Sequence, residues 1–155
     1  MAELTEGQKA PSFTLPTDAG GTVRLGDLKG RRIVLYFYPK DDTSGCTKQA
    51  LAFTEKRAAI EALKAIVIGV SKDSVAAHDK FKAKHLLAIT LGSDEDGKVV
   101  ERYGVWVEKS MYGRSYMGID RSTFLIDEAG VIRRIWRKVK VPGHVEAVIE
   151  ALKAL

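Results

Sequence analysis

The residues of this chain with the strongest capacity for chemistry lie in one short stretch, Thr43-Ser44-Gly45-Cys46. Cys46 is the only cysteine among 155 residues, and a hydroxyl-bearing side chain stands three positions before it. A cysteine attacks through its thiolate, and a nearby hydroxyl can hold a small polar oxygen substrate against the sulfur. Because Thr43 occupies the first position of a possible C-x-x-C pair, a dithiol–disulfide cycle within the stretch is impossible. The residue types therefore point to single-thiol chemistry.

The segments on either side of this stretch predict a buried strand followed by a helix. Residues 33–38 form an apolar run of strand length, Pro39 ends it, and residues 41–45 are turn formers. Apolar residues then recur at helical spacing to about Lys64. A lone cysteine is more often a small buried hydrophobe, but the start of a helix stabilises a thiolate through unpartnered N–H groups and a positive dipole. This junction favours a reactive Cys46.

The rest of the pattern predicts an α/β fold with a mixed central sheet flanked by helices. A second apolar strand, residues 65–70, follows the helix and completes a right-handed βαβ unit. Residues 11–15 and 22–25 are expected to form an N-terminal β-hairpin that covers one edge of the fold. The other expected elements are helix 75–85, a weak strand 87–91, helix 98–103, a long aromatic loop 104–120, antiparallel strands 122–127 and 131–139, and a closing helix 144–155.

Length and composition predict one domain, residues 1–155, without a membrane partner. No apolar run approaches the roughly 20 residues of a membrane helix, and the first six residues lack the features of a signal peptide. One cysteine allows no internal disulfide, so we expect a cytoplasmic location. The net charge of +5 is densest over residues 133–140. That run could contact nucleic acid, but a solvated basic strand is the expected reading, because no nucleic-acid motif accompanies it.

Several aromatic and histidine side chains carry weaker signals. Trp106, Tyr112 and Tyr116 could line a pocket wall, but we expect them to cover the core, with Trp106 near the site. His78, His85 and His144 are expected at the surface, and their spacing suits no metal.

The stretch around Cys46 resembles the active site of the peroxiredoxins. The pattern Pro39-x-x-x-Thr43-x-x-Cys46 matches the motif of that family, and residues 36–47 are similar to its bacterioferritin comigratory protein branch, also called the Q type. Residues 103–106 and 121–127, the segment 11–13 and the closing helix resemble the same branch, so the likeness covers nearly the whole chain. It implies a thioredoxin-like fold and a thiol-dependent peroxidase for hydrogen peroxide and small organic hydroperoxides, without metal, flavin or haem.

The resemblance also implies a role for each residue of the motif. Cys46 corresponds to the peroxidatic thiolate, which attacks a peroxide oxygen and becomes a sulfenic acid. Thr43 corresponds to the hydroxyl that hydrogen-bonds peroxide and sulfur, although its alternative role is an N-cap. Arg121 corresponds to the arginine that stabilises the thiolate and the leaving oxygen; without the resemblance, an exposed arginine opening a strand is equally plausible. Pro39 would shield the sulfenic acid, and the N–H groups of Gly45 and Cys46 would face the site.

Three further residues are expected to support the site. Gln49 stands where many relatives have glutamate and would help to fix the arginine. Tyr38 and Trp106 are expected beside the motif.

This sequence departs from the branch in its cysteines. Many relatives carry a resolving cysteine five residues after the first, where this chain has Leu51, and others carry one near residues 81–84, where there is none. Ser44 also replaces a usual proline. We therefore expect a one-cysteine mechanism, with thioredoxin, glutaredoxin or a low-molecular-weight thiol as the reductant. The resemblance favours a monomer.

Three alternatives remain open at this point. A thiol-disulfide transferase would act on disulfides instead of peroxides. A thioredoxin-fold protein that only binds a partner would be favoured if a Thr43→Val variant kept full peroxidase activity, because the inferred site would then be idle. Nucleic-acid binding through residues 133–140 would depend on salt.

Overall fold

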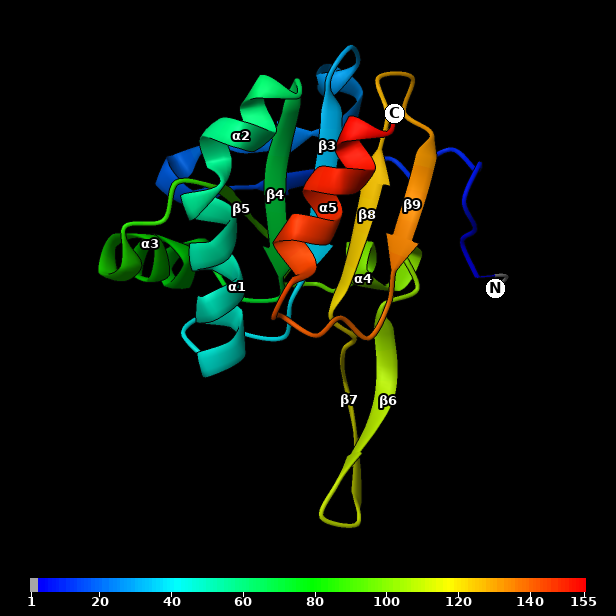
Figure 1. The fold of residues 1–155 in the computed structure, drawn as a ribbon. Coiled ribbons are helices and arrows are strands. Elements are labelled where there is room, and N and C mark those ends of the chain that lie inside the picture. The colour runs from blue at the N-terminus through cyan, green and yellow to red at the C-terminus, as the bar shows by residue number, and fades with distance from the viewer. Residues whose placement is uncertain (1–2) are drawn as a thin grey trace.

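Five strands build the central sheet of the computed structural model, which describes residues 3–155 (Figure 1). Their order is β5 (Thr90–Ser93), β4 (Ala65–Ser71), β3 (Arg32–Phe37), β8 (Ser122–Ile126) and β9 (Ile132–Trp136). β3 pairs with β4 in parallel and with β8 antiparallel, so the sheet is mixed. β5 joins β4 in parallel, and β9 joins β8 antiparallel. The predicted α/β fold with a mixed sheet is confirmed.

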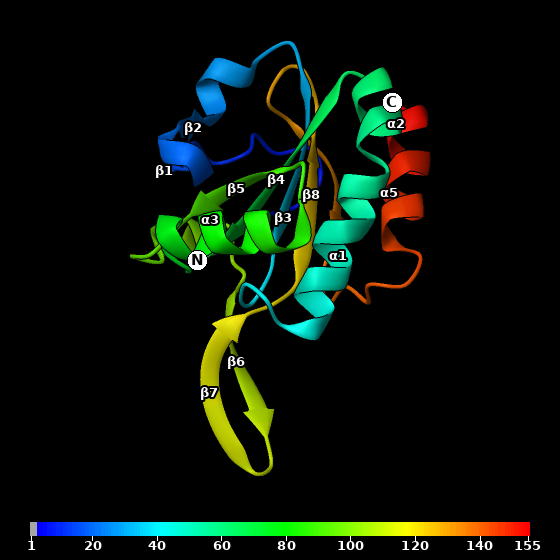
Figure 2. The same ribbon diagram turned by 90° about the vertical axis from the view of Figure 1, so that its left-hand side faces the viewer.

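Helices cover both faces of this sheet (Figure 2). α1 (Ser44–Glu55), α2 (Arg57–Ala62) and α5 (His144–Lys153) lie on one side. The hairpin of β1 (Thr14–Pro16) and β2 (Thr22–Arg24) lies on the other. α3 (Val75–His85) packs at the β5 edge and buries Phe81 in the same core as α1 and α5. The short helix α4 (Lys98–Arg102) packs its buried residues against the same core as β1 and β2. Within residues 3–155, none of the helices could span a lipid bilayer.

β3 connects the two cores through the alternation of its side chains. Val34 and Tyr36 belong to the core under α1 and α5, whereas Ile33, Leu35 and Phe37 belong to the core on the opposite face. All five are at most 2% exposed. A central strand buried on both faces needs an uninterrupted apolar run, which is why this segment was recognisable as a strand.

The N-terminal hairpin packs against the β5 edge of the sheet. Thr17 forms an isolated bridge to Gly92, and a Cβ added at Gly92 would lie 3.2 Å from Leu15 Cδ1. Two short 3-10 helices, η1 (Asp18–Gly20) and η2 (Leu25–Leu28), follow β1 and β2 respectively. The prediction of an edge-covering hairpin is confirmed, with shorter strands than expected.

Two predicted elements have different bounds in the structure. The helix expected to continue to Lys64 is interrupted at Lys56. The break leaves the apolar pattern unchanged, because Phe53 before it and Ile60 after it are both fully buried. The strand expected at 87–91 lies at 90–93 instead, since it is Gly92 and its neighbours that pair with β4.

The expectation of a long aromatic loop over residues 104–120 is wrong. β6 (Trp106–Met111) and β7 (Arg114–Ile119) form a regular antiparallel hairpin that projects from the body of the molecule (Figures 1 and 2). Its turn, Tyr112-Gly113, has positive φ at both residues, as tight hairpins require. Most of the hairpin is solvated on both faces, so no apolar alternation marks it. Tyr112 is 97% exposed and Tyr116 44%, so the expectation that they cover the core is also wrong.

Two of the three histidines are buried, contrary to the surface placement expected for them. His78 is completely covered and contacts Asp41 and the Gly92 carbonyl. His144 opens α5 and contacts the Thr123 hydroxyl at 2.7 Å. Buried polar rings need such partners, and both sets of partners come from distant parts of the sequence.

Candidate active site

Cys46 lies in the first turn of α1, directly after the turn that follows β3. Its side chain is covered: the residue is 1% exposed. Of the three residues that precede it in the sequence, Thr43 and Ser44 are exposed and Gly45 is half-buried. The first N–H groups of α1 have no acceptor within the helix and are directed at whatever lies before it. The helix start thus provides hydrogen-bond donors and a positive dipole next to the sulfur.

Arg121 reaches the sulfur from a neighbouring strand. It directly precedes β8, and the register of β8 on β3 sets Ser122 opposite Phe37, at the end of β3 that leads to the Cys46 turn. Arg121 Nη2 donates to Cys46 Sγ at 3.3 Å. A Cβ at Gly45 would lie 3.2 Å from the same nitrogen, so the absence of a side chain there makes room for the guanidinium.

Gln49 fixes the other arm of the guanidinium. It stands one helical turn after Cys46, on the same face of α1, and is completely buried. Its Oε1 accepts a hydrogen bond from Arg121 Nη1 at 2.6 Å. Its Nε2 has no partner within residues 3–155. Arg121 is therefore oriented by a neutral group, which leaves its positive charge available to the sulfur.

Thr43 occupies the N-cap position of α1 but does not cap it. No helix N–H bonds to its side chain; instead its hydroxyl donates to the Lys40 carbonyl at 2.9 Å. A hydroxyl has one proton and two lone pairs. With the proton committed to Lys40, the exposed oxygen of Thr43 can accept a hydrogen bond from a peroxide O–H.

Pro39 and Trp106 line one cleft of about 380 Å³ beside the turn. Met117 and Ile119 of β7 contribute to its apolar wall, and Lys72 Nζ lies 4.1 Å from the centre of the Trp106 ring. The half-buried Trp106 therefore stands next to Pro39, while the sulfur itself lies outside this cleft.

Tyr38 is buried, and its hydroxyl donates to Asp41 Oδ1 at 2.6 Å instead of facing the sulfur. Burial raises the pKa of Tyr38, and the charge of Asp41 raises it further. Tyr38 thus stabilises the turn between β3 and α1 through Asp41.

One buried group near the sulfur was not singled out from the sequence. The pKa of Tyr36 is raised, first by burial and then by the negative field of Cys46, and its hydroxyl has no partner among residues 3–155. Its ring stacks on Phe53 of α1 at 4.8 Å. A tyrosine inside an apolar strand gives no sequence signal beyond that of a core residue.

The structure therefore brings three of the predicted residues, Cys46, Arg121 and Gln49, into one hydrogen-bonded group. Thr43 and Gly45 adjoin it along the chain, and Pro39 with Trp106 form the neighbouring cleft. The arrangement provides a nucleophile, a fixed cation, the N–H donors at the start of α1 and one hydroxyl acceptor within one small volume. It suits attack by sulfur on a small molecule whose departing atom takes up negative charge.

Comparison with known proteins gives consistent matches along the chain. The model of the AhpC/TSA family matches residues 6–135. The chain is 50% identical over 147 residues to peroxiredoxin Bcp of Bacillus subtilis, covering 95% of this chain and 94% of that protein. Its fold is similar to that of Xylella fastidiosa PrxQ, with a TM-score of 0.94, 39% identity and coverage of 99% and 98% of the two chains.

A second structural relative has alkyl peroxide reduction activity. It is the Xanthomonas campestris bacterioferritin comigratory protein, whose structures are described in terms of alkyl peroxide reduction. The two chains share 43% identity, with a TM-score of 0.88 and coverage of 92% of this chain and 90% of the other.

Proposed function

The chain belongs to the AhpC/TSA family and is a peroxiredoxin, a thiol-dependent peroxidase, and from that premise we propose that Cys46 is its peroxidatic residue. Hydrogen peroxide and small organic hydroperoxides are the proposed substrates, the latter in keeping with the alkyl peroxide reduction named for the Xanthomonas protein. The observation that carries the proposal is the contact of 3.3 Å between Arg121 Nη2 and Cys46 Sγ.

In the proposed reaction the thiolate of Cys46 attacks one peroxide oxygen and the O–O bond breaks. The new S–O bond gives a sulfenic acid, and the departing oxygen takes a proton to leave as water or an alcohol. Arg121 stabilises the charge first on the sulfur and then on the departing oxygen, while Thr43 accepts the peroxide O–H. The N–H groups of Gly45 and Cys46 complete the set of donors. Because these groups are already in place, little reorganisation opposes the reaction.

The remaining site residues support Cys46, Arg121 and Thr43. Gln49 holds the guanidinium of Arg121 in the orientation that faces the sulfur. Pro39 shields the sulfenic acid from water at the mouth of the turn. Tyr38 and Trp106 support the turn and its cleft, respectively.

Regeneration of Cys46 requires a thiol from outside the chain, because there is no second cysteine. A first thiol condenses with the sulfenic acid to a mixed disulfide and releases water, and a second thiol displaces Cys46 as the free thiolate. Thioredoxin, glutaredoxin and low-molecular-weight thiols are the proposed reductants. This chemistry needs a reducing compartment, so we propose that the protein acts in the cytoplasm, as a single-domain monomer.

The decisive experiment measures peroxide consumption by the purified protein with each reductant supplied separately. We expect catalytic turnover of hydrogen peroxide and of a small organic hydroperoxide with at least one reductant, and none for Cys46→Ser. Absence of turnover with every thiol, together with unchanged mass of Cys46 after peroxide, would refute the proposal.

A further inference from the structure

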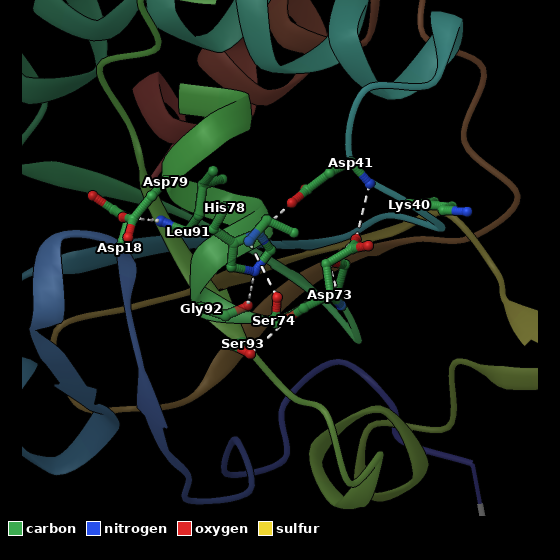
Figure 3. A network of polar contacts seen from close by, with 12 residues as sticks. Asp18, Lys40, Asp41, Asp73, Ser74, His78, Asp79, Leu91, Gly92 and Ser93 are labelled. Carbon is green, nitrogen blue, oxygen red and sulfur yellow. Dashed lines mark hydrogen bonds and ion pairs between the residues drawn. The ribbon is translucent and has the colours of Figure 1, made fainter. Parts of the chain in front are cut away.

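A buried ion pair connects the turn before Cys46 to α3 (Figure 3). His78, on α3, is completely covered, and its Nδ1 lies 2.7 Å from Asp41 Oδ2. Its Nε2 lies 2.9 Å from the Gly92 carbonyl of β5. The ring thus joins three elements: the turn that leads into α1, the helix α3, and the edge strand β5.

Both ring nitrogens of His78 face groups that can only accept. The Gly92 carbonyl has no proton to give, and the Asp41 carboxylate already accepts from the Tyr38 hydroxyl. A neutral imidazole carries one N–H, so only the imidazolium satisfies both contacts. Burial by itself lowers the pKa of His78, but the hydrogen bond and charge of Asp41, the Gly92 carbonyl and the charge of Asp73 outweigh it and raise the pKa.

Asp41 is also held through its backbone. Its N–H donates to Asp73 Oδ2 at 2.8 Å (Figure 3). The Ser71 hydroxyl donates to the same oxygen at 2.6 Å. Asp41 is separated from Thr43 only by Asp42, which has a left-handed backbone with φ of 60°. The position of Asp41 therefore determines how the chain enters α1 and where Thr43, Gly45 and Cys46 lie.

Resting on the proposed peroxidase function, we propose that His78 is a positioning residue: as an imidazolium bonded to Asp41, it holds residues 39–45 in the closed geometry in which Cys46 meets peroxide. The groups that face its ring are Asp41 and Tyr38 from the β3 side, Asp73 from the segment before α3, and the Gly92 carbonyl from β5. When His78 loses its proton, one of its two buried contacts loses its hydrogen, and the turn is released.

This arrangement separates the two halves of the catalytic cycle. The peroxide step needs the closed turn, whereas an external thiol must reach a sulfur that is 1% exposed when the turn is closed. Weakening the ion pair should therefore slow oxidation of Cys46 without slowing its reduction. A purely structural role of His78 would impair both steps together.

The test is Asp41→Asn, which keeps the shape and an acceptor for His78 but removes the charge. We expect the rate of Cys46 oxidation by hydrogen peroxide to fall about tenfold, the loss typical of one charge-assisted hydrogen bond. The rate of reduction by the thiol should stay unchanged or rise. In the wild type the oxidation rate should decline on the alkaline side, and in the variant this decline should begin at lower pH.

Two further variants keep the test decisive. His78→Gln cannot lose a proton, so the alkaline decline should disappear even if the variant is slower. Asp42→Asn is the matched control: it breaks the pairs with Lys84 and His85 of the same helix, which are more exposed and contribute little. We expect a change of less than about twofold for it.

A failure of the positioning role of His78 can be told apart from a failure of the proposed peroxidase function. If the wild type is an active peroxidase but folded Asp41→Asn and His78→Gln retain its oxidation rate and alkaline decline, the positioning role is refuted. If the wild type itself does not react with peroxide, the proposed function fails.

Discussion

Replacement of Arg121 by lysine tests whether the geometry of the guanidinium, and not merely its charge, supports the chemistry at Cys46. In the structure one arm of the fork donates to Cys46 Sγ at 3.3 Å and the other to Gln49 Oε1 at 2.6 Å. A lysine ammonium is a single point on a flexible stem and cannot make both contacts in the same orientation. Arg121→Ala removes the charge as well, so the two variants separate the two contributions.

The expected magnitudes follow from these distances. A unit charge 3.3 Å from a thiolate contributes about 5 kcal/mol at an effective dielectric constant of about 20. In Arg121→Ala, water that enters the vacated space replaces part of this stabilisation of the thiolate. We therefore take the expected loss as about 3 kcal/mol, the value typical of one oxyanion donor. That corresponds to a fall of at least about a hundredfold in the rate of the peroxide step for Arg121→Ala. Arg121→Lys keeps the charge and should lose about tenfold, the value of one charged hydrogen bond.

The assay is single-turnover oxidation of the reduced protein by hydrogen peroxide, followed as sulfenic acid on Cys46 by trapping and intact mass. Arg133→Ala is the control, because this arginine is exposed on β9 and, among residues 3–155, pairs with Asp127 alone. Its rate should equal that of the wild type. Equal rates for Arg121→Ala and the wild type would refute the electrostatic reasoning, and equal rates for Arg121→Lys and the wild type would refute the argument from fork geometry.

Three further outcomes are expected. Thr43→Val should lower kcat/KM for peroxide by about tenfold or more, while Thr43→Ser, which keeps the hydroxyl, should stay near the wild type; steady-state kinetics compare them. Excess peroxide without thiol should add first one and then two oxygens to Cys46, as intact mass will report, and a single unmodified species would contradict the one-cysteine mechanism. Burial, followed by the charge of Arg121, lowers the pKa of His144 to about 4 from 6.5, so the unfolded chain binds more protons between these values. The free energy of unfolding should therefore fall by roughly 3 kcal/mol as pH drops from 6.5 to 4; urea denaturation of His144→Gln should show a smaller fall.

Local patterns in the sequence were sufficient for the strand, turn and helix around Cys46. An uninterrupted apolar run, a proline and a cluster of turn formers each act through nearest neighbours, and β3 and α1 follow from them directly. The contact between Cys46 and Arg121 does not follow from local patterns. Arg121 is 75 residues away and approaches only through the pairing of β8 with β3. The expectation of that contact came from the family resemblance and not from any periodicity.

The features that the sequence did not reveal depend on long-range contacts or lack an apolar signal. The hairpin of β6 and β7 is solvated on both faces, so its strands show no alternation. The burial of His78 depends on Asp41 and Gly92, which reach it only once β3, α3 and β5 are assembled. In both cases the residue types are compatible with a surface loop or an exposed helix face, and only the tertiary structure decides.

The covered sulfur makes a final prediction about where the structure opens. A thiol carried by a peptide or protein cannot touch a residue that is 1% exposed, so the closed turn must open between oxidation and reduction. The start of α1 is the weakest point, because Thr43 stands at the N-cap without capping it, and a missing cap costs a helix about 1 kcal/mol. Amide hydrogen exchange should therefore be faster over residues 44–48 than over the buried second half of α1. Thr43→Asp, which restores a capping acceptor, should slow that exchange and the reduction of oxidised Cys46 together; faster exchange in the second half of α1 than in its first turn would refute this site of opening.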